Sequence, residues 1–76
     1  QGNDRAQYSL GLHYVKGLGM LQDNIRAHMW FNISASLGNE SARKGRGIVE
    51  QKMTPLDISK SQNLARECVE KGYNGC

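Results

Sequence analysis

The chain has 76 residues, of which 38% are hydrophobic, and a net charge of +3 at pH 7. A chain of this length forms one small domain that buries only about 60% of its unfolded surface, so we expect a thin core and no deep pocket. Two classes of protein are excluded. The chain is not a nucleic-acid binder, because its basic residues do not gather in a stripe, and it is not inserted in a membrane, because no apolar run is long enough.

The first predicted helix covers residues 4–16. Its apolar residues recur every four positions on a face that we expect to point inward: Ala6, Leu10 and Tyr14. Gly17 can end this helix, because glycine readily adopts the left-handed backbone conformation found there. The second predicted helix covers residues 23–37, with Asp23 as its cap and Trp30 as a core residue.

The third predicted helix covers residues 40–52 and contains Gly45 and Gly47. Each glycine costs about 1 kcal/mol in a helix interior, so we expect a close contact with a neighbouring element to justify them. The fourth helix is predicted to begin at Thr54-Pro55, where a capping hydroxyl precedes a proline, and to stop at Gly72. No segment alternates apolar and polar residues, and the expected fold class is all-α.

Self-comparison indicates two units within the single domain 1–76, which we place at residues 3–38 and 39–76. An offset of thirty-six aligns Asn3 with Asn39, Gly11 with Gly47, and Leu12 with Ile48. An offset of thirty-four aligns Trp30 with Leu64 and Gly38 with Gly72. Two helices per unit and a period near thirty-five are typical of an α-solenoid.

The first unit closely resembles the Sel1-like repeat, an α/α solenoid repeat related to tetratricopeptide repeats. The matching residues are Ala6, Leu10-Gly11, Tyr14, Gly17-Leu18-Gly19, Asp23, Ala27, Trp30 and Ala35-Ser36-Leu37-Gly38. The second unit lacks the tyrosine, the Gly-x-Gly loop and the tryptophan, as expected of a diverged terminal repeat. The resemblance implies two antiparallel helix-turn-helix repeats that act as a protein–protein interaction scaffold, without catalysis or a cofactor, at the C-terminal end of a longer bacterial solenoid.

Two cysteines lie near the C-terminal end, Cys68 and Cys76. They resemble those of the cysteine-rich bacterial branch of the family, in which such pairs form disulfides. The resemblance therefore implies a Cys68–Cys76 disulfide and a periplasmic or extracellular location. Two reduced thiols, compatible with a cytoplasmic location, are the alternative.

Other site chemistries have little support. His13 and His28 belong to different predicted helices, and the cysteine spacing of zinc sites is absent, so we expect no metal. No serine, histidine or acid stands in a nucleophile-elbow or phosphate-loop context, so we expect no enzyme. A small secreted cell-wall-binding protein or enzyme is the alternative function, and a homo-dimer through exposed repeat faces is an open alternative for assembly.

A surface for a partner protein or peptide is predicted on the first helix of each unit. Leu12 and Ile48, which the offset of thirty-six aligns, would form an apolar strip there. The strip would receive a peptide or an acidic segment, with these residues beside it: Arg5, Ser9, Lys16 and Lys52. The alternative is that the strip is plain surface or packs against a preceding repeat.

Overall fold

The computed structural model describes residues 3–17 and 23–76, and these form helices and turns without a strand. There are four helices: α1 (Asp4–Lys16), α2 (Asn24–Ser36), α3 (Glu40–Glu50) and α4 (Pro55–Glu70). The all-α prediction is confirmed, and each helix starts within one residue of its predicted position. Most of the predicted glycine loop, residues 18–22, lies outside the described residues.

Local capping explains where the helices begin and end. The side chains of Asn3, Asp23 and Asn39 accept hydrogen bonds from free backbone amides of α1, α2 and α3. At the start of α4, Thr54 Oγ1 accepts from the Asp57 amide at 3.1 Å, and Asp57 Oδ2 accepts from the Thr54 amide at 3.3 Å. This reciprocal pair is a capping box, which satisfies two amides that the helix itself cannot.

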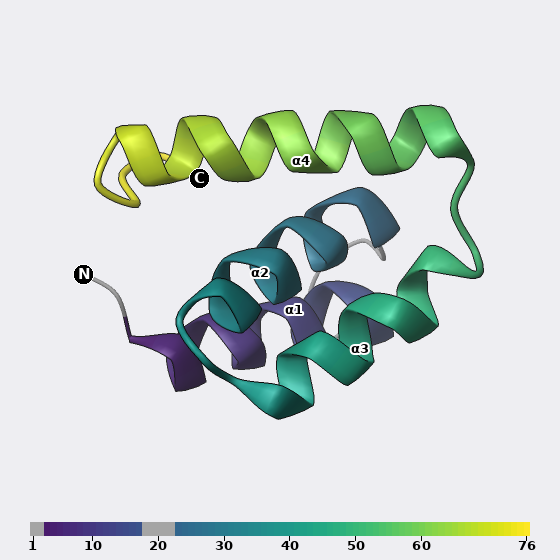
Figure 1. Cartoon of the computed structure of the whole chain (residues 1–76), viewed down its shortest axis with the longest axis horizontal. Coiled ribbons are helices and arrows are strands. Elements are labelled where there is room, and N and C mark those ends of the chain that lie inside the picture. The colour runs from purple at the N-terminus through teal and green to yellow at the C-terminus, as the bar shows by residue number, and fades with distance from the viewer. Residues whose placement is uncertain (1–2, 18–22) are drawn as a thin grey trace.

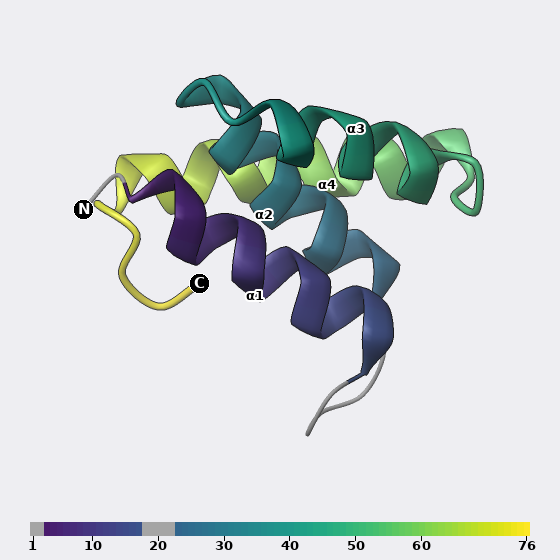
Figure 2. The same ribbon diagram turned by 90° about the horizontal axis from the view of Figure 1, so that it is seen from below.

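Helix α2 lies at the centre of the fold. The other three helices all pack against it, and α1 also touches α3. Figure 1 shows α2 between α3 on one side and α4 on the other, and Figure 2 shows α1 and α3 running in the same general direction from the same end. Helices α3 and α4 follow each other in the chain but make little direct contact. The second helix pair is therefore held together mainly through α2.

The core divides into two clusters on opposite sides of α2. One joins α2 to α4 through Met29, Trp30, Ile33, Ala65 and Cys68. The other joins α2 to α3 through Phe31, Ala42 and Val49, with half-buried residues of α1 packed against it. Trp30 is buried, as the sequence predicted, and Tyr14 packs against its cluster while remaining half-exposed.

The inward face of α1 differs from the prediction. Ala6 and Leu10 are exposed, and the buried residues of this helix are Gln7 and Gly11. The helix is turned by about one residue (roughly 100°) because it approaches α2 through a glycine. A Cβ on Gly11 would lie 2.5 Å from two ring carbons of Phe31, so only glycine permits this approach.

The close contact expected in the third helix is made by Gly45 and not by Gly47. A Cβ on Gly45 would lie 3.1 Å from the Phe31 ring, whereas a Cβ on Gly47 would meet no atom within 4 Å. The Phe31 ring is therefore held between Gly11 of α1 and Gly45 of α3. The offset of thirty-six aligns the caps of the two units, but an offset of thirty-four aligns these two packing glycines.

Candidate functional site

A groove runs between α1 and α3 over the Phe31 ring. Its volume is about 320 Å³, which is at the lower end of the range for small-molecule sites. Its walls are mostly apolar, and its lining residues are Tyr8, Leu12, Val15, Phe31, Ser41, Lys44, Gly45, Ile48 and Val49. We call this feature the α1–α3 groove. Ile48 is 61% exposed, so an apolar side chain of a partner has a large apolar surface to cover.

Polar contacts fasten the N-terminal ends of the two walls. At their shared N-terminal end, Asn39 Nδ2 donates to Asp4 Oδ2 at 2.9 Å, and Ser34 Oγ donates to the Asp4 carbonyl at 2.6 Å. The groove floor is also supported, because the ring of Tyr8 packs on that of Phe31 with centroids 5.7 Å apart. These contacts hold α1 and α3 at a set spacing, so the groove is formed before any partner arrives.

The one charged residue among those that line the groove is a lysine. Lys44 lines it, and Lys16 and Lys52 stand near the C-terminal ends of the two helices that form its walls. Within the described part of the chain none of these three lysines forms an ion pair. The three ammonium groups are therefore available to acidic groups of a ligand.

The structure brings together part of the predicted partner surface. Leu12 and Ile48 line the same groove, as the strip hypothesis required. Arg5, Ser9, Lys16 and Lys52 are exposed but do not line it. Three lining residues were not among those predicted, namely Lys44 and the apolar Tyr8 and Val15. The intervals of four and three from Tyr8 through Leu12 to Val15 are a helical apolar pattern that could have revealed the groove wall.

A polar cluster at His28 links three helices. His28 of α2 is 1% exposed, and its Nδ1 contacts the hydroxyl of Ser61 on α4, while its Nε2 lies 2.7 Å from Oε2 of Glu50 on α3. In the tautomer that carries its proton on Nε2, this nitrogen donates to the carboxylate and Nδ1 accepts from the hydroxyl. The cluster therefore connects α3 and α4, which make little direct contact with each other.

The His28 cluster has the residue types of a hydrolase triad, but Ser61 has no exposed surface. A substrate has no path to that hydroxyl in this arrangement, and a nucleophile must be reachable. The two histidines have different surroundings, because His28 is buried, whereas His13 is exposed on α1 and its ring contacts the Ser9 carbonyl. No group of three or more potential metal ligands occurs in residues 3–17 and 23–76.

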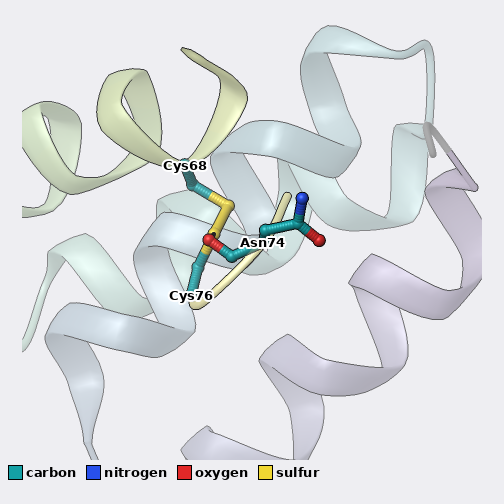
Figure 3. Close-up of a disulfide and its surroundings, with 3 residues drawn as sticks. All are labelled: Cys68, Asn74 and Cys76. Carbon is teal, nitrogen blue, oxygen red and sulfur yellow. Dashed lines mark hydrogen bonds between the residues drawn. A yellow bond between two sulfur atoms is a disulfide. The ribbon is translucent and has the colours of Figure 1, made fainter. Parts of the chain in front are cut away.

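The two cysteines form a disulfide. It joins Cys68 of α4 to Cys76 (Figure 3), and the two Cα atoms are 5.7 Å apart. Cys68 is 2% exposed and belongs to the core cluster of α2 and α4, against which Tyr73 and Cys76 also pack. The disulfide therefore fastens the C-terminal turn onto the core.

None of the described helices is long and apolar enough to cross a membrane.

Comparison with known proteins agrees with the fold. The family model of the Sel1 repeat matches residues 4–39, a segment that includes α1, α2 and Asn39, the cap of α3. No curated protein and no solved structure matches the chain. Within the matched segment, Gly11 permits the close approach to α2 and Trp30 fills the core, so these positions of the repeat have structural roles.

Proposed function

We propose that this chain is a non-catalytic scaffold whose α1–α3 groove binds a segment of a partner protein, because residues 4–39 match the model of the Sel1 repeat, a repeat that generally mediates protein–protein interactions. The observation that carries the proposal is the exposure of Ile48 beside Leu12 over a supported apolar floor. Fully burying one aliphatic side chain contributes about 1.5–3 kcal/mol. One or two apolar anchors of a partner would thus supply a useful part of its affinity.

The partner segment combines apolar anchors with acidic residues. The unpaired ammonium groups of Lys16, Lys44 and Lys52 favour carboxylates at the edge and end of the groove. Charges of this kind raise the association rate and select the orientation more than they raise the affinity. An acidic amphipathic segment of a partner protein therefore fits this surface better than a basic one.

Affinity capture with matched baits tests the proposal. The wild-type chain, Leu12→Asp, Ile48→Asp and Leu56→Asp are compared as baits against extract of the native cell. Leu56 is the control, because it is 65% exposed on α4 and does not line the groove. We expect the same partner on the wild-type and Leu56→Asp baits and at least about tenfold less on the two groove variants. Equal recovery on all four folded baits would reject the groove as the binding surface.

The disulfide supports a periplasmic or extracellular location, and the divergence of the second unit supports an end position in a longer solenoid. Structural disulfides form and persist in oxidising compartments, and this one lies against the core. The second unit falls outside the matched repeat, as a diverged terminal repeat would. Thiol alkylation in intact cells tests the oxidation state that this location requires. We expect the disulfide to protect both cysteines from alkylation, and full alkylation without a reductant would contradict the proposed location.

A further inference from the structure

The C-terminal turn carries an asparagine directly before a glycine. Asn74 and Gly75 are both exposed and lie within the loop that the Cys68–Cys76 disulfide closes. The side-chain amide of Asn74 points away from the disulfide (Figure 3). In the described chain, no hydrogen bond engages this side-chain amide or the backbone N–H of Gly75. Within the described residues, therefore, no hydrogen bond holds Cγ of Asn74 away from the backbone nitrogen of Gly75, which can attack it.

We propose that Asn74 is a site of spontaneous deamidation, with the backbone nitrogen of Gly75 as nucleophile. The nitrogen loses its proton to solvent and forms a bond to Cγ of Asn74, and the bond from Cγ to Nδ2 breaks with release of ammonia. Water then opens the resulting cyclic imide. Attack of water at Cγ produces aspartate, whereas attack at the former backbone carbonyl produces isoaspartate. No electrons are transferred to or from the protein at any step.

Two other asparagines show how the fold can hold this residue type in place. Asn39 accepts from the Ala42 amide and donates to Asp4, so its side chain is engaged at both ends. Asn63 is exposed but lies within α4, where the next backbone amide belongs to the helical hydrogen-bond ladder. That amide becomes a nucleophile only after local opening of the helix. Asn74 is also the one asparagine in the sequence that is followed by glycine, which offers no side chain to obstruct the attack.

Isoaspartate at position 74 alters the disulfide-closed loop. The main chain then passes through the former side chain, which adds a carbon atom to a ring that spans a sequence separation of only 8. Tyr73, next to the site, packs on the core cluster of α2 and α4, and its own φ is 68°. Enlargement of the ring therefore disturbs the packing of Tyr73. The aspartate product leaves the ring unchanged and adds one negative charge.

Peptide mapping of the full oxidised chain tests the proposal. The purified protein is incubated in mildly alkaline buffer, digested with trypsin and reduced, and two peptides are compared: residues 72–76 with Asn74, and residues 61–66 with Asn63. We expect conversion at Asn74 at least about tenfold above that at Asn63, because the latter requires helix opening. Isoaspartate is detected by its enzymatic methylation, and the rate should rise with pH as the attacking nitrogen loses its proton.

Two comparisons make the outcome decisive. Asn74→Gln should leave the 72–76 peptide unconverted, and a reduced, urea-unfolded sample should convert Asn74 no more than a few-fold faster than the folded chain. Equal conversion of the two peptides, or protection of Asn74 in the folded chain to the level of Asn63, would overturn the proposal. The effect on the loop is tested by thermal unfolding: the Tm of the isoaspartate form should be lower than that of the Asn74→Asp variant. Equal Tm values would contradict the predicted disturbance of Tyr73.

Discussion

Replacing Gly11 by alanine should destabilise the protein, although alanine is the better helix former. The added Cβ would lie 2.5 Å from two ring carbons of Phe31 and 3.1 Å from a third, whereas carbon atoms attract each other best at about 3.5–4.0 Å. The ring has little room to withdraw, because its other edge already lies against Gly45 of α3. Relief of the contact therefore requires movement of α1 away from α2.

The magnitude follows from two opposing terms. Overpacking of a core costs about 1–3 kcal/mol, and replacement of a helical glycine by alanine returns about 1 kcal/mol. Because two ring carbons are involved, we place the overpacking term in the upper half of its range and expect a net loss of about 1–2 kcal/mol. For a domain of this size that corresponds to a fall in Tm of about 4–16 °C.

Thermal and urea unfolding of the oxidised chain measure the effect, with Gly47→Ala as the matched control. Gly47 is a helical glycine of α3 with nothing within 4 Å of its added Cβ, so this variant isolates the propensity gain and should raise the free energy of unfolding by about 0.5–1 kcal/mol. A Gly11→Ala protein as stable as the wild type, alongside the expected gain for Gly47→Ala, would refute the role assigned to the Phe31 contact.

Two further predictions concern the contacts that hold α4. Ser61→Ala leaves the buried Nδ1 of His28 without its partner and should lower the free energy of unfolding, measured in urea, by about 1–3 kcal/mol. The control is Gln62→Ala at the exposed neighbouring position, which should change this free energy little. Equal effects of the two variants would contradict a stabilising role of the contact between His28 and Ser61. Reduction of the Cys68–Cys76 disulfide should cost about 2.5 kcal/mol in the chain-entropy treatment and lower Tm by at least about 10 °C; a Tm that is insensitive to reductant would show that the disulfide does not stabilise the fold.

The helices could be predicted from the sequence because their boundaries depend on neighbours in the chain. A cap such as Thr54 bonds to the amide of Asp57 three residues later, and Gly17 ends α1 through its own φ of 68°. The first repeat was recognisable for a related reason, since its glycine, tryptophan and small residues stand at the spacings that are typical of the Sel1-like repeat. These signals lie within single helices or within one repeat, so no knowledge of the tertiary packing was needed.

The rotation of α1 and the partners of His28 could not be predicted in this way. Alanine, leucine and tyrosine at four-residue spacing suggested one inward face, yet α1 buries Gln7 and Gly11 because the Phe31 ring from another helix occupies the space in front of it. His28 meets Ser61 and Glu50 at sequence separations of 33 and 22.

The sequence was thus sufficient to predict the four helices, to identify the first repeat, and to align Leu12 with Ile48. The packing of three helices around α2 determined which glycine makes the close contact, where the buried polar groups find partners, and which residues wall the α1–α3 groove. The physical reason is that local backbone hydrogen bonding sets a helix, whereas its rotation depends on the volume and polarity of side chains that are distant in the chain.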